Sequence, residues 1–281
     1  MVAKIISGKE LAIKTRKFIS EQINLYKDKP HLAIILAGNN DASKLYVRNK
    51  IKAAEEIGIT TSLFLFDDTV LQTEIENLIN KLNNDNAING IMIQLPLPKN
   101  IDETKILEMI NPLKDVDGFH PYNIGLLQNG SDKAIVAATP KGIIRLLEET
   151  KIDFSGKNAL VIGRSQIVGK PISMLLLNKN CTVTIAHSKT KDITTLISNA
   201  DIIVAACGCP KLVKGKDIKN NAIIIDVGIN YVDGKLCGDV DFESAKEKAS
   251  FITPVPGGVG PMTIAMLLEN TLIAYKKQNN L

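Results

Sequence analysis

The chain has 281 residues, enough for two domains with cores of their own, and its 45% hydrophobic and 23% charged residues are ordinary for a globular protein. Its formal net charge of +4 comes from scattered lysines, which argues against nucleic acid as a partner and is sufficient for a small anionic ligand. Because no apolar run approaches the ~18 residues of a membrane span and no secretory signal is present, we expect a cytoplasmic protein without a membrane partner.

In the first half of the chain, apolar runs typical of strands alternate with helical periods. We expect strands at 31–38, 61–66 and 88–98, and helices at 9–28, 43–57, 71–84 and 102–111. Such alternation is typical of a parallel sheet with helices on its faces, so these elements predict one α/β unit.

The helix expected over 43–57 carries a lysine in the middle of its apolar face. At about 100° per residue, Lys50 lies at the centre of the apolar arc and Tyr46 lies one turn before it. A buried ammonium costs free energy unless it is paired or loses its proton, although a lysine at the rim of the arc can also extend to water. Lys50 is therefore a candidate functional residue.

Polar side chains stand where strands of this first unit end. Gln94 follows the apolar residues of the strand predicted at 88–98, close to the carboxyl edge where open α/β sheets bind their ligands. Asp115 and Asp117 lie two residues apart in a loop rich in turn-forming residues. Either carboxylate could bind a ligand or cap a turn, and both readings stay open.

The alternation of strands and helices restarts after a helix predicted at 139–150. We expect strands at 158–163, 182–186, 201–208, 222–228 and 251–253. A last helix at 262–277 follows a Gly/Pro loop and can return to the first unit. The sequence thus predicts an α/β protein of two domains, residues 1–139 plus 263–281 and residues 140–262, the second a Rossmann-like, doubly wound parallel sheet.

A glycine loop opens the second unit. Gly163 and Gly169 allow a tight turn and a close approach to a pyrophosphate, although Ser165 takes the place of a second glycine, so a structural turn is an equal alternative. The next strand ends at 186–190 without the carboxylate that binds the ribose of NAD, and Arg164 adjoins Gly163. These features favour NADP over NAD.

The cysteines offer no metal site. Cys181, Cys207, Cys209 and Cys237 lack the paired spacing of a zinc site, and we expect them to be buried thiols in a reducing compartment. No metal is predicted.

Eight segments, taken together and in order, resemble the bifunctional methylenetetrahydrofolate dehydrogenase/cyclohydrolase family from near residue 8 to about residue 275. They are 43-SKLYVRNK-50, 92-MIQLPLP-98, 115-DVDGFHPYNIG-125, 139-TPKG-142, 161-VIGRSQIVGKP-171, 187-HSKT-190, 226-DVGIN-230 and 253-TPVPGGVGPMT-263. The last segment is highly distinctive. One departure is Ala138, which stands where relatives often have cysteine.

The resemblance implies roles for individual residues. Lys50 would be the central catalytic residue, Gln94 would hydrogen-bond and tune it, Tyr46 would stack on the aminobenzoyl ring of folate, and Asp117 would bind the pterin edge. The substrate would also be bordered by Pro256, Gly257, Gly258 and Val259. The dinucleotide would be contacted by Gly163, Arg164, Ser165, Val168, Gly169, Ser188 and Ile229.

The same resemblance implies a reaction and an assembly. The first domain would hold folate and the second NADP, on either side of a cleft, in a homodimer formed through the second domain. Hydride would pass from methylenetetrahydrofolate to NADP, and water would open the resulting methenyl cation to formyltetrahydrofolate. Two alternatives remain open: an enzyme that is a dehydrogenase only, and a non-enzymatic module that senses NADP.

Overall fold

The computed structural model describes residues 2–281, which form two compact units. The three-stranded unit comprises Lys14–Ala138 and Ile264–Leu281, and the six-stranded unit comprises Met1–Ile13 and Thr139–Thr263. The sequence prediction places residues 1–13 in the first domain, whereas residues 2–13 group with the six-stranded unit in the structure. The reason is that β1 (Lys4–Ile5) pairs in parallel with β11 (Phe251–Ile252).

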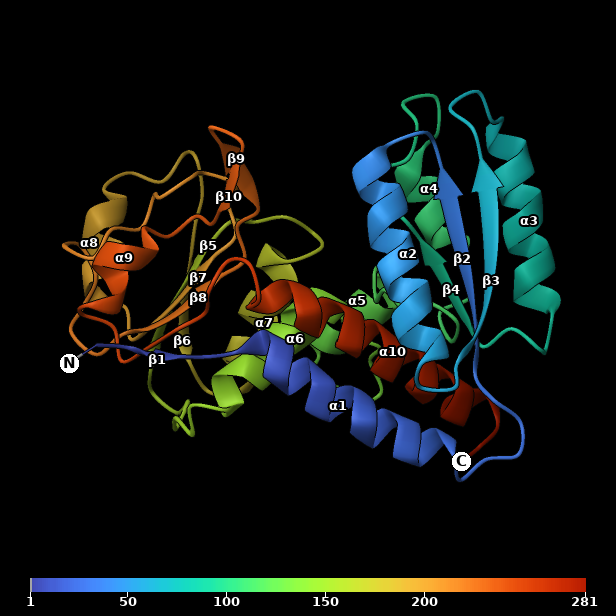
Figure 1. Cartoon of the computed structure of the whole chain (residues 1–281), viewed down its shortest axis with the longest axis horizontal. Helices are drawn as coiled ribbons and strands as arrows, with labels where there is room; N and C mark the ends of the chain where they lie inside the picture. The colour runs from blue at the N-terminus through green and yellow to red at the C-terminus, as the bar shows by residue number, and fades with distance from the viewer. Residues whose placement is uncertain (1) are drawn as a thin grey trace. The chain divides into compact units, whose positions relative to one another are not determined.

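A short parallel sheet in the order β3-β2-β4 is the centre of the three-stranded unit. The central strand β2 is buried from Leu32 to Ala37, as expected for a strand covered on both faces. Figure 1 shows α2 and α3 on opposite sides of this sheet. The elements are β2 (His31–Ala37), β3 (Thr60–Phe66), β4 (Gly90–Ile93), α2 (Asp41–Glu55), α3 (Gln72–Asn84), α4 (Glu103–Glu108) and α5 (Pro121–Gln128).

The six-stranded unit contains a parallel sheet in the order β1-β11-β8-β7-β5-β6. The order reverses between β5 and β7, as in doubly wound sheets that bind ligands at that point. Its further strands and helices are β5 (Asn158–Ile162), β6 (Thr182–Ala186), β7 (Ile202–Ala205), β8 (Ile223–Asp226), α6 (Ala138–Glu148), α7 (Gly169–Asn178), α8 (Ile193–Asn199) and α9 (Phe242–Lys246). A separate hairpin is formed by β9 (Asn230–Val232) and β10 (Lys235–Cys237), and the unit boundary falls within α1 (Gly8–Ile23) and α10 (Val259–Gln278). The predicted α/β class with a Rossmann-like sheet is confirmed.

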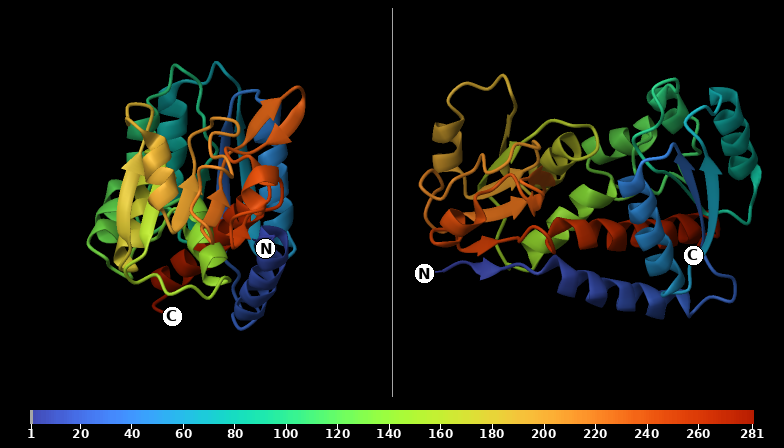
Figure 2. Two further views of the ribbon diagram at one scale, coloured as in Figure 1. Left: turned by 90° about the vertical axis from the view of Figure 1, so that its left-hand side faces the viewer. Right: turned by 45° about the horizontal axis from the view of Figure 1, so that its top comes forward.

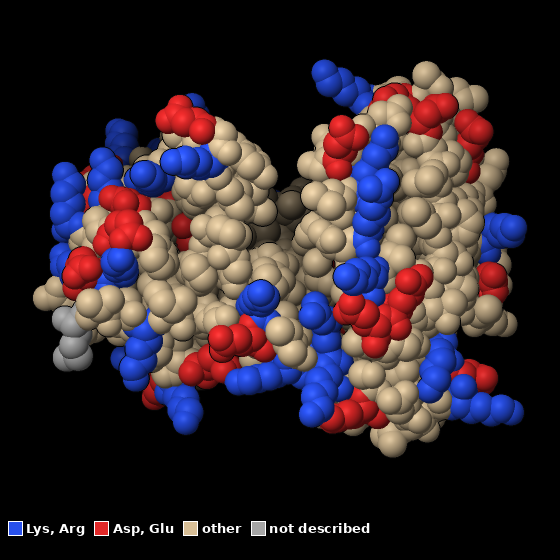
Figure 3. Space-filling view, in the orientation of Figure 1, with Lys and Arg blue, Asp and Glu red and all other residues tan. Residues whose placement is uncertain are grey.

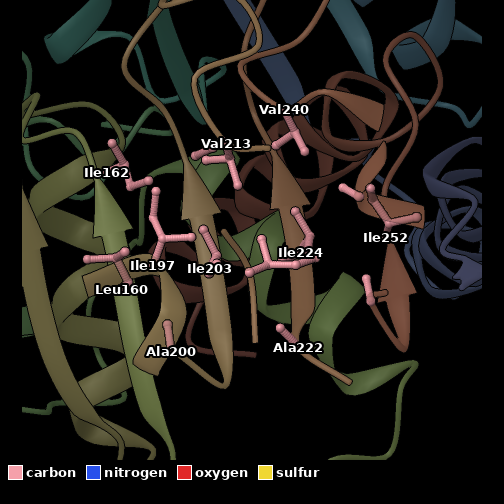
Figure 4. Close-up of a cluster of buried hydrophobic side chains, with 14 of the residues drawn as sticks. Leu160, Ile162, Ile197, Ala200, Ile203, Val213, Ala222, Ile224, Val240 and Ile252 are labelled. Atoms are coloured by element: carbon pink, nitrogen blue, oxygen red, sulfur yellow. The ribbon is translucent and has the colours of Figure 1, made fainter. Parts of the chain in front are cut away.

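One face of the six-stranded sheet forms a continuous apolar core. Figure 4 shows Leu160, Ile203 and Ile224, from three neighbouring strands, pointing to the same side as Ile197 of α8. Each fully buried side chain of this kind stabilises the fold by about 1.5–3 kcal/mol. The two further views in Figure 2 show this sheet with helices packed along it. The core fixes the carboxyl ends of the strands, where the loops described below begin.

Two short elements were not predicted from the sequence. Helix α5 begins inside the predicted loop 115–125, because His120 caps it by accepting a hydrogen bond from the N–H of Tyr122 and Pro121 takes its first turn. The β9–β10 hairpin follows the strand predicted at 222–228, in a segment to which no element was assigned.

The surface drawn in Figure 3 carries lysines and arginines interspersed with aspartates and glutamates. Among the helices of residues 2–281, none has both the length and the apolar character needed to cross a membrane.

Candidate functional site

Helix α2 places Lys50 and Tyr46 on its inward face. The helix starts where the Asn40 side chain accepts a hydrogen bond from the N–H of Ser43 at 3.0 Å. From this start, Lys50 falls on the buried stripe with Val47 and Ala54, and only 6% of Lys50 is exposed. Of the two alternatives left open for Lys50, a buried ammonium group and a lysine that extends to water, the structure has the buried one.

The Lys50 ammonium group has three neighbours, and none is a carboxylate in direct contact. Its Nζ donates to Gln94 Oε1 at 3.1 Å and to Met92 Sδ at 3.3 Å, and lies 4.6 Å from the centre of the Tyr46 ring. Within the described residues, Lys50 forms no ion pair. The structure thus brings together the predicted Lys50, Gln94 and Tyr46, and adds Met92, which the sequence reading did not single out.

Gln94 is held so that its oxygen faces Lys50. It follows β4, and its N–H donates to the carbonyl of Ile35, which continues the sheet ladder by one residue. The side-chain NH₂ donates to the carbonyl of Leu95 at 2.7 Å. With the nitrogen end used in this way, the amide oxygen is left for the lysine, and the pair is positioned by the sheet rather than by a loop.

Asp117 lies near Lys50 and acts on it through space. Burial lowers the pKa of Lys50, and the Asp117 charge partly opposes that shift. Burial raises the pKa of Asp117 to about 7, with Lys50 and a backbone hydrogen bond from Ile93 opposing the rise and Asp115 adding to it. Both groups therefore have a pKa displaced towards neutrality, as acid–base groups in active sites commonly do.

Asp115 serves the backbone instead of a ligand. Its carboxylate accepts hydrogen bonds from the N–H groups of Gly118, Phe119 and His120 at 3.0, 3.2 and 2.9 Å, and from the Asn123 amide at 2.9 Å. Only 2% of the residue is exposed. Of the two carboxylates that the sequence left open, Asp115 is thus the turn cap, and Asp117 is the one that faces Lys50.

In the six-stranded unit, the predicted glycine loop joins β5 to α7. Gly163 has φ +131°, and a Cβ at this position would overlap the carbonyl oxygen of Ala206. A Cβ on Gly169 would likewise overlap the carbonyl of Gly163. Both positions therefore require glycine, because the backbone approaches itself closely where the helix begins.

Ser165 shapes this loop, and Arg164 extends from it. The Ser165 hydroxyl accepts hydrogen bonds from the N–H groups of Val168 and Gly169 at 3.2 and 3.3 Å. Arg164 is exposed and makes no hydrogen bond or ion pair within residues 2–281. Its guanidinium is thus available to an anion, and a dinucleotide phosphate fits a loop of this kind, with a helix N-terminus behind it.

The turn after β6 is formed by residues 186–190, which include no carboxylate. His187 and Thr190 close the turn, since the His187 N–H donates to the Thr190 hydroxyl at 2.9 Å, while Ser188 is exposed. Ile229 follows β8 and is 70% exposed. Gly163, Ser188 and Ile229 all lie just beyond the carboxyl ends of strands in one sheet, so this unit presents them at the edge where such sheets bind ligands.

The predicted substrate loop at Pro256–Val259 belongs to the six-stranded unit and packs on the start of α1. The carbonyl of Gly257 accepts a hydrogen bond from the N–H of Lys9 at 3.0 Å, and Gly257 has φ +99°. A Cβ on Gly8 would overlap the carbonyl of Gly258. Backbone conformation and close packing therefore require glycine at these positions, whether or not a ligand binds.

Two buried carboxylates escaped the sequence reading. Asp226 accepts hydrogen bonds from the N–H groups of Gly228, Asp239 and Val240, and Asp239 accepts from Cys207 and Gly208 and from the Asn230 amide. Burial raises the pKa of Asp226 to about 6. The pair ties together the loops after β7 and β8. Asp226 begins the segment 226-DVGIN-230 quoted above, but its burial and its hydrogen bonds to residues 239 and 240 could not be read from that segment.

The prediction that all four cysteines are buried is wrong. Cys181 is buried, but Cys207 and Cys209 are exposed and Cys237 is intermediate; all are free thiols. Within the described chain, no three His, Cys, Asp or Glu side chains are grouped to hold a metal ion.

Comparisons with solved structures agree with this architecture. The bifunctional enzyme FolD, a methylenetetrahydrofolate dehydrogenase/cyclohydrolase from Campylobacter jejuni, is 46% identical with a TM-score of 0.97, covering 99% of this chain and 100% of its own. The methylenetetrahydrofolate dehydrogenase-cyclohydrolase (FolD) of Trypanosoma brucei, solved with NADP cofactor and inhibitor, is 38% identical with a TM-score of 0.95, covering 100% of both chains.

Sequence comparisons identify the family. The bifunctional protein FolD of Staphylococcus aureus strain Newman is 51% identical over 286 residues, covering 100% of this chain and 99% of its own. The family model for the tetrahydrofolate dehydrogenase/cyclohydrolase catalytic domain matches residues 6–117, and that for the NAD(P)-binding domain matches residues 137–279. The chain therefore belongs to the tetrahydrofolate dehydrogenase/cyclohydrolase family, which confirms the resemblance found in its motifs.

Proposed function

We propose that this chain is a bifunctional enzyme that oxidises 5,10-methylenetetrahydrofolate with NADP and hydrolyses the methenyl product to 10-formyltetrahydrofolate. The three-stranded unit would hold the folate and the six-stranded unit the NADP. One observation carries the assignment of the chemistry. Lys50 is buried and held by an amide oxygen, a thioether and an aromatic ring, without a carboxylate in direct contact.

The three-stranded unit would bind the substrate through groups of matching chemistry. The Tyr46 ring offers a flat surface for the aminobenzoyl group, one helical turn from Lys50. Asp117, with its pKa raised to about 7, presents oxygens to the amino and ring N–H donors of a pterin. Folate would thus lie with its reactive methylene carbon near the Lys50 Nζ.

In the oxidation step, the protein positions the substrate and tolerates the charge that develops. NADP, when bound, supplies the acceptor for the hydride that leaves the methylene carbon. No proton needs to leave the substrate in this step, so Lys50 is not required as a base. A lysine with a lowered pKa spends more of its time as a neutral amine, which does not repel the positive charge of the methenyl product.

In the hydrolysis step, Lys50 would act as general base. Water attacks the methenyl carbon, and the neutral amine takes a proton from that water as the carbon–oxygen bond forms. The Gln94 oxygen accepts a hydrogen bond from Lys50 at 3.1 Å and so keeps the amine directed at one place. As the ring opens, the hydroxyl proton of the adduct moves to the departing nitrogen and the carbon–oxygen double bond of the formyl group forms. Lys50 then releases the proton that it took from water to the solvent.

The cofactor assignment rests on the glycine loop and the turn after β6. Gly163, Arg164, Ser165, Val168 and Gly169 would surround the phosphates, with Ser188 and Ile229 at the neighbouring strand ends. The preference for NADP is supported by the exposed, unpaired Arg164 and by the absence of a carboxylate at residues 186–190, within the part of the chain that the structure describes. The Pro256–Val259 loop is proposed to border the folate.

We also infer a cytoplasmic homodimer formed through the six-stranded unit. Strand β6 is the last strand of its sheet and pairs only with β5 within the described chain. Ile185 in this strand is 39% exposed, and an open edge of this kind is a ready surface for a second copy. The mass of the purified protein, measured by light scattering, tests the dimer.

A single assay tests the proposed function. The enzyme is mixed with 5,10-methylenetetrahydrofolate and NADP, and NADPH and the methenyl compound are followed separately. The proposal expects NADPH to form while the methenyl compound stays low, because it is hydrolysed as it appears. Accumulation of the methenyl compound in step with NADPH would leave a dehydrogenase only, and the absence of NADPH would leave an NADP-binding module.

A further inference from the structure

The turn after β7 carries two exposed thiols that the proposed chemistry does not use. Cys207 and Cys209 flank Gly208, and both are free and exposed. Gly208 has φ +65°, in the left-handed region that favours glycine, and the chain bends at Cys207. The turn stands at the carboxyl edge of the six-stranded sheet.

Hydrogen bonds hold this turn with the Cys207 sulfur beside Cys209. The Cys207 sulfur accepts a hydrogen bond from the Cys209 N–H, and the Cys207 thiol is hydrogen-bonded to the Asp239 carboxylate. Asp239 Oδ2 also accepts from the N–H groups of Cys207 and Gly208 at 2.7 and 3.0 Å. Because Gly208 alone separates the two cysteines, rotation of their side chains can bring the two sulfurs to bonding distance.

The two thiols differ in chemical character. Desolvation, together with the Asp239 charge, raises the pKa of the Cys207 thiol to about 12, so Cys207 keeps its proton. Cys209 is exposed and has no such hydrogen bond to a carboxylate among the residues that the structure describes. Cys209 is thus the thiol that an oxidant in solution attacks first, and Cys207 is the one positioned to respond.

We propose that Cys207 and Cys209 form a reversible disulfide on contact with a peroxide, and that this disulfide weakens dinucleotide binding. The peroxide transfers one oxygen to the Cys209 sulfur, giving a sulfenic acid and water. The Cys207 sulfur then attacks the Cys209 sulfur, the sulfur–oxygen bond breaks, and the hydroxyl leaves as water with the Cys207 proton, which Asp239 is placed to relay. A dithiol reductant reverses the reaction and is itself oxidised to a disulfide.

The turn is packed directly on the glycine loop. A Cβ on Gly163 would overlap the carbonyl oxygen of Ala206, the residue before Cys207, and the Ala206 N–H donates to the carbonyl of Ile162 at 2.8 Å. A disulfide between Cys207 and Cys209 closes a small ring and so changes the backbone of the turn. Because the turn already contacts Gly163, this change would displace the glycine loop. The expected loss of affinity rests on the proposed cofactor role of the glycine loop, whereas the disulfide itself does not.

Peptide mass spectrometry tests the disulfide. The full-length protein is treated with hydrogen peroxide, its remaining thiols are alkylated, and the peptide that contains both cysteines is analysed. We expect this peptide to lose two hydrogen atoms, to escape alkylation, and to recover both thiols with dithiothreitol. Cys237→Ser, the matched control, should behave like wild type, whereas Cys209→Ser should form no disulfide. Alkylation of both thiols in treated wild type, or a disulfide from either cysteine to Cys237, would overturn the proposal.

A titration with NADP tests the consequence. Peroxide-treated wild type should bind NADP roughly fivefold or more weakly than the reduced protein, at the lower end of typical coupling between two sites. Peroxide should leave the NADP affinity of Cys209→Ser unchanged. Equal NADP affinity in fully disulfide-bonded and reduced wild type would overturn the regulatory part. If reduced wild type binds no NADP at all, the proposed function fails. The mass measurement would still show whether the disulfide forms.

Discussion

The three-stranded unit buries two lysines in very different surroundings. Lys50 is 6% exposed and Lys114 is 5% exposed. The Lys114 Nζ donates to the backbone carbonyls of Leu82, Asn83 and Asp85 at 2.9, 2.9 and 2.8 Å, at the end of α3. The Lys50 Nζ has one amide oxygen, a thioether sulfur and an aromatic ring instead.

The difference in partners supports a structural role for Lys114 and the proposed catalytic role for Lys50. Burial lowers the pKa of both lysines, and a nearby carboxylate opposes the shift in each case, Asp117 for Lys50 and Asp85 for Lys114. However, three carbonyl oxygens satisfy all three N–H groups of Lys114, and the C-terminal end of a helix favours a positive charge. Lys50 keeps hydrogen-bonding capacity that the protein does not use. The partners of a buried lysine thus distinguish these roles better than its burial does.

The largest expected effect follows from removing the reactive amine. Lys50→Met keeps the volume of the side chain and suits an apolar site, so the protein should remain folded and bind NADP. Loss of a general base should slow hydrolysis of methenyltetrahydrofolate by ~10²–10⁴-fold, while part of the dehydrogenase activity survives. Separate assays of the two reactions measure the split. Wild-type hydrolysis by a folded Lys50→Met enzyme would make Lys50 a packing residue and break the comparison.

Lys114→Met should show the opposite pattern. The change leaves three carbonyl oxygens at the end of α3 without their donor, so the unfolding free energy should fall by roughly 2–3 kcal/mol. Activity per folded molecule should be unchanged, because Lys114 has no proposed contact with substrate. Urea unfolding and the same two assays provide the measurement, with Lys50→Met as the matched variant. Equal stability losses in the two variants would contradict the structural role of Lys114.

Asp115 and Asp117 offer the same comparison for acids, between a side chain that holds the backbone and one that is proposed to bind the substrate. Asp117→Ala should weaken folate binding by about 1.5–3 kcal/mol and slow both reactions, with the NADP affinity of the free enzyme unchanged. Asp115→Ala should instead lower stability, because it strips the acceptor from three backbone N–H groups. Folate titration and urea unfolding separate the two effects. Normal folate binding by Asp117→Ala together with weak binding by folded Asp115→Ala would reverse the assignment.

Arg164 is a third kind of cation, exposed and without a partner in the described chain. Arg164→Ala should weaken NADP binding by about 1.5–3 kcal/mol, the value of a charge-assisted contact, and leave NAD binding nearly unchanged. The ratio of the two dissociation constants is the informative quantity. Lys170→Ala, which removes an exposed cation from α7 just after the loop, is the control. Equal losses for NADP and NAD would exclude Arg164 from recognition of the extra phosphate.

Lys50 and Lys114 show which buried lysines can be recognised from the sequence alone and which cannot. Lys50 stands out because its partners are side chains in a recognisable pattern, Tyr46 one turn before it and Gln94 at a strand end. Lys114 gives no such signal, because its partners are backbone carbonyls that any residue can supply. The sequence motifs thus singled out the lysine that we propose to be reactive, and they did not single out Lys114. Met92 was also overlooked, since a methionine in an apolar strand is indistinguishable from core.

Elements that depend on local pattern were predicted better than those that depend on distant partners. Strand β2, predicted at 31–38, is observed at His31–Ala37 because a buried strand needs a continuous apolar run. Strand β1 is two residues long and exists only through its distant partner β11, so no local pattern predicts it. Cys207 and Cys209 were predicted as buried because cysteine generally is, but a turn at a sheet edge overrides that preference.

The smallest expected effect concerns pH, because burial raises the pKa of Asp117 from its usual 3.8 to about 7. The folded protein then holds this proton more tightly than the unfolded chain, so the contribution of Asp117 to stability is greatest at low pH and is lost as the pH rises towards 7. Between pH 6 and 8 the loss is on the order of 1 kcal/mol, since one pKa unit corresponds to about 1.4 kcal/mol. Asp117→Asn cannot ionise and should lose less stability over this interval in urea unfolding, whereas the exposed Asp132→Asn should follow wild type. If the unfolding free energies of wild type and Asp117→Asn changed with pH in parallel, Asp117 would titrate alike in the folded and unfolded chain. The surroundings of Lys50 would then differ from those of Lys114 through hydrogen bonds alone.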